Sequence, residues 1–298
     1  MATHNDASTE YWGQPELTGA AFDFRSDVIT TPSLGMFDAI RRATLNDDVY
    51  GEDRTTSAFE EEMATICGKE AGAFVISGTM ANQLSLRTLL KEAPPYSILT
   101  DAQSHIIHWE AGGAAFINGA MIQPIRPLNG RHLTVEDAKK HAVLAYDVHK
   151  TPTRVVSLEN TTAGTVIPLE ELRRLKAWAE KNQIGVHMDG ARLFEAVAAG
   201  GGSLREFAQC ADLVTLDFSK NLGAPMGAMV LGSREDIRKL KRTRKGLGGG
   251  MRQAGVLVAA ARQAVVENFG LGEFDTVGAL ARSHDIAKLI GDIWTQRG

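Results

Sequence analysis

The chain has 298 residues, a formal net charge of −4 at pH 7 and a hydrophobic content of 44%. Its length fits either one large α/β domain with an appendage or two domains, and such a chain buries enough surface to fold without disulfides. The slight excess of acidic groups argues against nucleic acid or an acidic membrane surface as the main partner. No run of about 20 apolar residues occurs, so we expect no transmembrane helix.

The segment 1–21 is polar, with neither an apolar signal-peptide core nor the arginine-rich character of a transit peptide. We expect it to be a disordered tail. The two cysteines, Cys67 and Cys210, form no C-x-x-C motif. Both are expected to be reduced, small and buried, which favours a cytoplasmic location.

Short β-branched runs alternate with longer amphipathic stretches from Phe74 onward. This alternation predicts βαβ units and a largely parallel sheet. The basic run from Glu235 to Lys245 is typical of a solvated helix face. We expect strands at 73–76, 96–100, 155–158, 184–188, 213–216 and 227–231, and helices at 80–91 and 169–181.

A glycine-rich run from Gly246 to Arg252 resembles a dinucleotide-binding loop only at first sight. Met251 occupies the place of the last glycine in G-x-G-x-x-G, and a charged run rather than a strand precedes the loop. The sequence also lacks the G-x-x-x-x-G-K-[ST] motif, so neither nucleotide-binding signature is present.

Three polar groups follow predicted strands in an informative order. Gly78 and Thr79 open a helix after the first strand, where free amides and the helix dipole suit a phosphate, although an ordinary helix cap has the same pattern. Asp189 follows a later strand and can keep a pyridine nitrogen protonated. Lys220 follows the next strand and offers an amine that can bond to an aldehyde, although a lone lysine is most often a surface residue.

Ligands of open α/β sheets bind at the carboxyl ends of strands, so the order phosphate loop, acid, amine favours pyridoxal 5′-phosphate as cofactor. Arg192 can neutralise a phenolate or carboxylate, or form a local ion pair with Asp189. His105 can stack on a flat ring or relay a proton. His105 and His108 have the spacing of a metal pair, but no third ligand stands at a suggestive spacing, and we expect no metal.

Longer stretches of the chain resemble the low-specificity L-threonine aldolases, within the β-eliminating-lyase group of fold-type-I pyridoxal phosphate enzymes. The resemblance covers most of the chain in the family's order. It is carried by Phe24–Asp27, Asp47–Asp53, Ser77–Asn82, His105, Glu110–Ala114, Ser157–Thr161, His187–Arg192, Ser219–Gly227 and Gly248–Gln253.

The resemblance implies a fold-type-I large domain with a mainly parallel seven-stranded sheet at 22–268, and an incomplete small C-terminal domain at 269–298. It implies that Lys220 carries the cofactor, Asp189 holds the ring nitrogen and Arg192 contacts the ring oxygen. It places Gly78 and Thr79 at the phosphate and His105 on the ring face.

It further implies that Ser26 helps to hold the substrate carboxylate. Lys245 and Arg252 match residues that reach the phosphate of a neighbouring subunit. The implied assembly is therefore a homodimer or homotetramer with shared sites.

The implied reaction is cleavage of L-threonine or L-allo-threonine to glycine and acetaldehyde, with His105 or a water molecule as the base. Thr162 and Asn221 depart from the histidine and glycine common in the family, which affects substrate preference. The sequence from Asp217 to Asn221 is more similar to that of fungal members of the family, some of which resemble an alanine racemase. A racemase and a catalytically weak, C-terminally short paralogue are therefore alternative interpretations.

Overall fold

The computed structural model describes residues 20, 23–270 and 278–297. Except for Ala20, the predicted tail 1–21 lies outside the described residues. The centre of the molecule is a seven-stranded sheet in the order β1-β7-β6-β5-β4-β2-β3. All neighbouring strands are parallel except β7, which is antiparallel to both β1 and β6. The prediction of a mainly parallel α/β sheet is confirmed.

The strands are β1 (Ala71–Val75), β2 (Ser97–Asp101), β3 (Met121–Ile125), β4 (Thr153–Glu159), β5 (Gly185–Gly190), β6 (Leu213–Asp217) and β7 (Ala228–Gly232). The helices are α1 (Leu34–Arg41), α2 (Arg54–Cys67), α3 (Gly78–Leu89), α4 (His105–His108), α5 (Gly113–Phe116), α6 (Val135–His141), α7 (Leu169–Lys181), α8 (Leu193–Ala198), α9 (Leu204–Gln209), α10 (Arg234–Gly246), α11 (Gly255–Asn268) and α12 (Ala279–Arg297).

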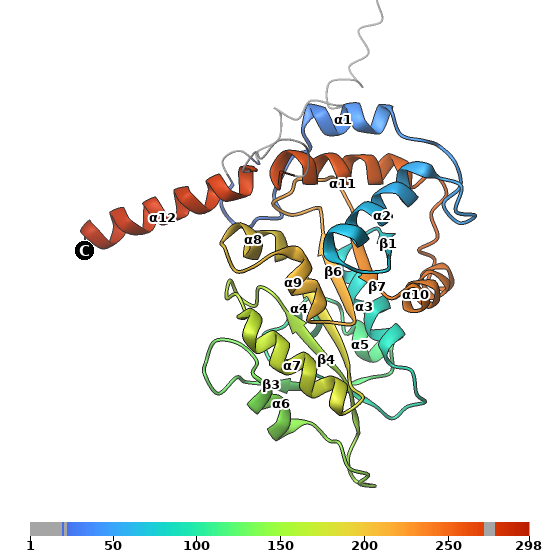
Figure 1. Ribbon diagram of the computed structural model, residues 1–298, viewed down its shortest axis with the longest axis vertical. Coiled ribbons are helices and arrows are strands. Elements are labelled where there is room, and N and C mark those ends of the chain that lie inside the picture. Colours follow the sequence, from blue (N-terminus) through green and yellow to red (C-terminus); the bar gives the residue numbers. More distant parts are fainter. Residues whose placement is uncertain (1–19, 21–22, 271–277, 298) are drawn as a thin grey trace, which may run out of the picture.

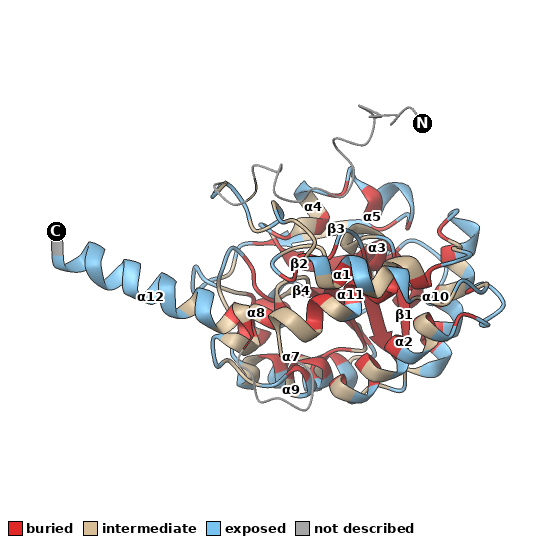
Figure 2. Ribbon diagram, turned by 90° about the horizontal axis from the view of Figure 1, so that it is seen from above, coloured by how far each residue is buried: buried red, intermediate tan, exposed pale blue. Residues whose placement is uncertain are grey.

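Alternating side chains of each strand pack into two different cores, one on each face of the sheet. On β4, Val156 and Leu158 belong to the core under α2, α7 and α11, whereas Val155 belongs to the core under α3 and α10. Figure 2 shows the buried strands between these helical layers. Both faces of the sheet are therefore covered, which explains why the strands read as continuous apolar runs in the sequence.

Local signals in the sequence set the ends of several helices. Ser77 and Ser233 accept hydrogen bonds from Met80 N and Asp236 N, and so cap α3 and α10. Helix α2 ends at Gly68, whose positive φ of 65° suits glycine. The predicted basic helix at 235–245 is α10, but Arg244 on that helix is buried rather than solvated.

Helix α12 projects away from the body of the molecule (Figures 1 and 2). Near its start, Leu280 packs into the core, but farther along the helix a stripe of apolar side chains is exposed. The members of this stripe are Ile286, Leu289, Ile290, Ile293 and Trp294. Helix α11 ends at Asn268, and the domain boundary expected there stays a prediction. None of the described helices combines the length and apolarity that a membrane crossing needs.

Candidate active site

Strand β7 is antiparallel to both β1 and β6, so β1 runs in the same direction as β6. The carboxyl ends of β1, β2, β4, β5 and β6 therefore lie at one edge of the sheet. A pocket at this edge collects residues that are distant in sequence. It is lined by His105, Glu159, Thr161, Asp189, Ala191, Arg192 and Lys220. Four of these side chains, His105, Asp189, Arg192 and Lys220, are predicted site residues, and the structure brings all four together.

The amino end of α3 lies at the same edge, directly after β1. Ser77 caps the helix by accepting a hydrogen bond from Met80 N at 3.1 Å. Within the described part of the chain, the amides of Gly78 and Thr79 make no hydrogen bond. These two groups are therefore free to bind an anion, which the helix dipole favours at this end.

Asp189 is nearly buried at the end of β5, and both of its oxygens are engaged. Its Oδ1 accepts a hydrogen bond from Ala191 N at 3.0 Å, and its Oδ2 accepts one from Asn82 Nδ2 at 2.7 Å. Asn82 lies one turn into α3, so this contact fixes the acid relative to the helix. An acid held in this way is oriented before any ligand arrives.

The imidazole of His105 is bound by a buried carboxylate. Its Nδ1 lies 2.8 Å from Oε1 of Glu110, which also accepts a hydrogen bond from Asn82 Nδ2 at 2.8 Å. The other oxygen of Glu110 accepts a hydrogen bond from Gln83 Nε2 at 2.6 Å. The hydrogen bond to Glu110 raises the pKa of His105, and partial burial of the ring opposes this effect. Asn82 thus connects the supports of His105 and Asp189.

Glu159 brings a second titratable acid into the pocket. It ends β4 opposite Asp189 of β5, and its Oε2 accepts a hydrogen bond from the backbone amide of His105 at 2.7 Å. Burial and the nearby charge of Asp189 raise the pKa of Glu159 to about 7. A group that titrates near neutral pH can both accept and donate a proton.

Arg192 is paired with an acid that the sequence analysis did not single out. Its Nε and Nη2 donate to Oδ2 and Oδ1 of Asp27 at 2.6 and 2.7 Å, which is a bidentate contact. The alternative of a local ion pair between Arg192 and Asp189 is therefore wrong, because Asp189 bonds to Ala191 and Asn82 instead. The contact also ties the segment before α1 to the pocket.

The remaining predicted site residues lie outside the pocket lining. Ser26 is exposed next to Asp27, with its Oγ 3.4 Å from Oδ1 of that acid. Lys245 is exposed at the end of α10. Arg252 is 75% exposed and has its Nε 3.5 Å from Oδ2 of Asp47. Their proposed roles toward the substrate and a neighbouring subunit stay predictions.

His108, which has the spacing of a metal pair with His105, has its Nε2 bound to the carbonyl of Ala102 at 2.8 Å. Among the described residues, a different group has ligand atoms within 4.8 Å of one another: His105, Glu110 and Asp189. The amide of Asn82 already donates to both carboxylates of this group. The arrangement is thus accounted for by hydrogen bonds, and the expected absence of a metal stays a prediction.

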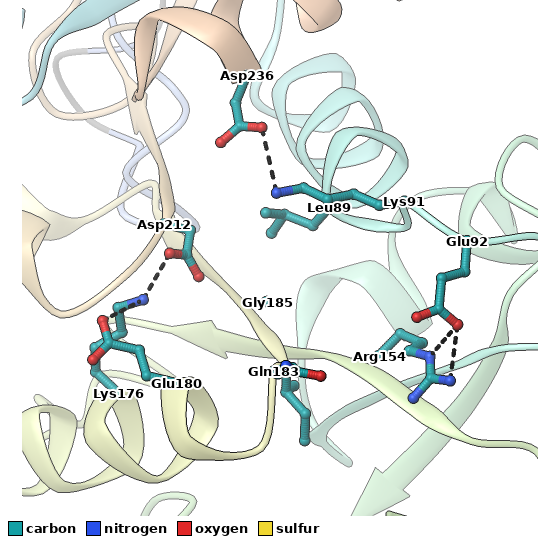
Figure 3. A pocket seen from close by; sticks show the side chains of 11 residues that line it. Leu89, Lys91, Glu92, Arg154, Lys176, Glu180, Gln183, Gly185, Asp212 and Asp236 are labelled. Atoms are coloured by element: carbon teal, nitrogen blue, oxygen red, sulfur yellow. Dashed lines mark hydrogen bonds and ion pairs between the residues drawn. The ribbon is translucent and has the colours of Figure 1, made fainter.

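A second pocket, of about 290 Å³, opens at the amino ends of β4, β5 and β6 (Figure 3). The charged side chains around it neutralise one another: Lys176 pairs with Asp212 at 2.6 Å, Arg154 with Glu92 at 2.8 Å and Lys91 with Asp236 at 3.7 Å. Because these ion pairs occupy the charged groups of the pocket, fewer of them are available to bind a ligand than at the carboxyl edge of the sheet.

Asn82, Glu110, Glu159 and Asp27 are the site residues that the sequence analysis left without a role. All four lie within the stretches that carried the resemblance, which was the available signal. Nothing in the spacing of Glu110 or Asn82 shows that they meet, because the contact depends on how α3 packs beside α4 and α5.

Comparison with known proteins agrees with a pyridoxal phosphate fold. A putative L-allo-threonine aldolase from Listeria monocytogenes superimposes with a TM-score of 0.72 at 24% identity, covering 88% of this chain and 72% of that one. This likeness establishes the fold-type-I architecture. The family model described as beta-eliminating lyase matches residues 23–293, so the chain belongs to the beta-eliminating lyase family. It is a pyridoxal-phosphate-dependent lyase.

Two curated relatives differ in their described activities. The alanine racemase TOXG of Cochliobolus carbonum is 55% identical over 96% of this chain and 73% of its own length. The low specificity L-threonine aldolase of Saccharomyces cerevisiae is 42% identical over 97% of this chain and 73% of its own length. These relatives share the family of this chain but act on different substrates, so membership of the family does not by itself identify the substrate.

Proposed function

We propose that the protein cleaves the β-hydroxy-α-amino acids L-threonine and L-allo-threonine to glycine and acetaldehyde. The observation that carries the proposal is one pocket that holds an amine, Lys220, with a fixed acid, Asp189, and two proton-accepting groups, His105 and Glu159. The similarity to the yeast threonine aldolase supports the same reaction.

The residues of the pocket suit pyridoxal phosphate at both of its charged ends. The unbonded amides of Gly78 and Thr79 would bind the phosphate, and the carboxylate of Asp189, held by Asn82, would accept the ring N–H. Lys220 would carry the cofactor, with His105 stacked on its face. Arg192 would contact the ring oxygen from its position against Asp27.

Bound pyridoxal phosphate supplies an electron sink for the bond that breaks at Cα. With the cofactor bound, Asp189 would keep the ring nitrogen protonated, and His105 or Glu159 would take the proton of the substrate β-hydroxyl. The Cα–Cβ bond then breaks, acetaldehyde leaves, and Cα takes up a proton to give glycine. Glu159 is a new candidate for the base beside His105 and a bound water.

An alanine racemase is the second candidate, and the 55% identity with the racemase TOXG favours it. In that reaction the Cα–H bond breaks, and a proton returns to the opposite face of Cα. The same lysine, acid and cofactor serve both reactions. The way in which the pocket places the substrate would decide between the two reactions.

One preparation of the protein with added pyridoxal phosphate separates the candidates. The visible absorption band of the bound cofactor is recorded first, followed by acetaldehyde release from L-threonine and D-alanine formation from L-alanine. We expect the band, together with faster threonine cleavage than racemisation. Lys220→Ala should abolish the band and lower turnover by several powers of ten.

Faster racemisation would replace the aldolase proposal with the racemase, and a band without either turnover would indicate a weak paralogue. If the band is unchanged in Lys220→Ala, the assignment of Lys220 is wrong.

We further propose a homodimer or homotetramer in the cytoplasm, with sites shared between subunits. The exposed positions of Lys245 and Arg252 support a contact with a neighbouring phosphate. Large apolar side chains on the surface support an interface, since Phe24 is 95% and Phe116 is 91% exposed. Cys67 and Cys210 are buried and unpaired, which agrees with a reducing compartment.

A further inference from the structure

Asp217 is a buried acid at the active-site edge that the proposed reaction does not use. It is the last residue of β6, three residues before Lys220. Its Oδ1 accepts hydrogen bonds from the amide and the hydroxyl of Ser219, both at 2.8 Å. Within the described part of the chain, Asp217 takes part in no ion pair.

The other oxygen of Asp217 faces the amino end of α3. A Cβ atom placed on Gly78 would lie 2.8 Å from Oδ2 of Asp217, so a side chain at this position would collide with the carboxylate. Only glycine lets the start of α3 and this acid approach so closely. The carboxylate therefore lies against the first residue of α3, at the helix end whose dipole favours a negative charge and whose first amides, those of Gly78 and Thr79, are free.

These are the same amides to which the cofactor phosphate is assigned. A phosphate monoester carries about −1.5 to −2 charges at pH 7, because its second pKa is about 6. A neighbouring carboxylate repels the dianion, and this repulsion is strong where water is partly excluded. The monoanion has less charge, and its P–OH group can donate a hydrogen bond to a carboxylate oxygen.

Building on the proposed cofactor site, we propose that Asp217 faces the cofactor phosphate and makes the site prefer the monoanion. The negative charge of Asp217 then lowers the affinity of the site for the phosphate as the pH rises through the second phosphate pKa. The structure places next to Asp217 the start of α3, Ser219 in its own loop and Ala228, its partner in the register with β7. Lys220 is the nearest ionisable residue in the sequence, and Lys245 and Arg252 of a neighbouring subunit are proposed to reach the same phosphate.

The test compares two ligands that differ only in the phosphate. Dissociation constants of pyridoxal phosphate and of pyridoxal are measured by equilibrium dialysis for the wild type and Asp217→Asn. At pH 8 we expect the variant to bind pyridoxal phosphate about tenfold more tightly, equivalent to about 1.4 kcal/mol, and pyridoxal within about twofold of the wild type. At pH 5.5 the gain with pyridoxal phosphate should shrink, because the monoanion dominates there.

Two controls keep the result interpretable. Asp285→Asn removes the same charge from an exposed position on α12 and should leave both constants unchanged. If Asp217→Asn folds poorly, the dissociation constants of pyridoxal phosphate and of pyridoxal are compared on the wild type at both pH values. The ratio of the pyridoxal phosphate constant to the pyridoxal constant should be larger at pH 8 than at pH 5.5.

Equal effects of Asp217→Asn on both ligands, or weaker binding of pyridoxal phosphate by the variant, would overturn the role of Asp217. So would a ratio of the two wild-type dissociation constants that does not depend on pH. These results differ from a failure of the cofactor site itself, in which wild-type protein with pyridoxal phosphate shows no absorption band that depends on Lys220.

Discussion

The imidazole of His105 is bound at 2.8 Å by Glu110, a carboxylate whose side chain is completely buried. Glu110 keeps this position because Asn82 and Gln83 of α3 donate to its two oxygens. The orientation and the charge of His105 therefore depend on a residue that does not line the pocket.

Replacement of Glu110 by glutamine should lower the pKa of His105. The hydrogen bond to Glu110 is the main cause of the raised pKa, and the partial burial that remains acts in the opposite direction. NMR titration of the imidazole ring measures the change. Glu52→Gln, at an exposed position, is the matched control and should leave the titration unchanged. An unaltered His105 titration in Glu110→Gln would show that another group sets its charge.

Replacement of Asp189 by asparagine should lower turnover by at least about a hundredfold, because a neutral amide does not stabilise a charged ring nitrogen. The fold should persist, since an asparagine oxygen can still accept a hydrogen bond from Asn82 or Ala191. Steady-state kinetics with matched cofactor occupancy measure the effect, and circular dichroism checks the fold. Turnover near that of the wild type would mean that another group holds the ring nitrogen.

Glu159 should make the stability of the cofactor-free protein depend on pH. Its pKa is about 7 in the folded chain, against an ordinary value of 4.5, so the folded state holds the proton more tightly. The stabilising contribution is complete below about pH 4.5 and disappears as the pH rises through about 7. Relative to Glu159→Gln, the wild type should lose about 1–3 kcal/mol of unfolding free energy over this range.

Urea unfolding of both proteins at pH 5 and pH 8 measures this difference. The glutamine variant keeps an acceptor for the His105 amide, so it changes the charge more than the packing. The charged groups that act on Glu159 include Asp189, His105, Lys220 and Arg192, and they are unaltered in the variant. Parallel pH profiles for the two proteins would refute the raised pKa.

Loss of Arg244 should destabilise the fold strongly. This buried arginine of α10 donates to Oδ2 of Asp48 at 2.8 Å and to the carbonyl of Phe74. Arg244→Leu leaves the buried carboxylate of Asp48 without its partner, which typically costs about 3–5 kcal/mol. Urea unfolding measures the loss, and Arg242→Leu on the exposed side of α10 is the matched control.

A second variant tests the reason for the loss. If the unpaired charge of Asp48 causes it, then Asp48→Asn combined with Arg244→Leu should recover part of the lost stability. A double variant less stable than Arg244→Leu alone would point to lost packing of the arginine side chain instead.

The buried strands were the part of the fold that the sequence predicted best. The apolar runs of β4, β5 and β6 are covered on both faces, and they were located to within one or two residues at most ends. Strand β3 was not located, because it forms the edge of the sheet, contains Pro124 and is partly exposed. Its side chains therefore lack the continuous apolar pattern.

The positions of Asp189 and Lys220 at one edge of the sheet were predicted, because each residue follows a strand that is visible in the sequence. Contacts that depend on a partner from another element were not predicted. Asp27 meets Arg192 because the folded chain brings the segment before α1 next to the end of β5, and Glu110 meets Asn82 through helix packing. Such contacts depend on tertiary geometry, which a single sequence does not encode in its local pattern.

The pairing of β1, the first strand, with β7, the last strand, has a consequence for the folding pathway. Gly78 follows β1 and Lys220 follows β6, and β7 lies between these two strands in the sheet. The two residues therefore come together only when β1 has paired with β7, which is far from it in the sequence. Pairings between distant parts of a chain form slowly. The cofactor pocket should therefore be completed late in refolding, so that recovery of the visible band follows the recovery of helical circular dichroism.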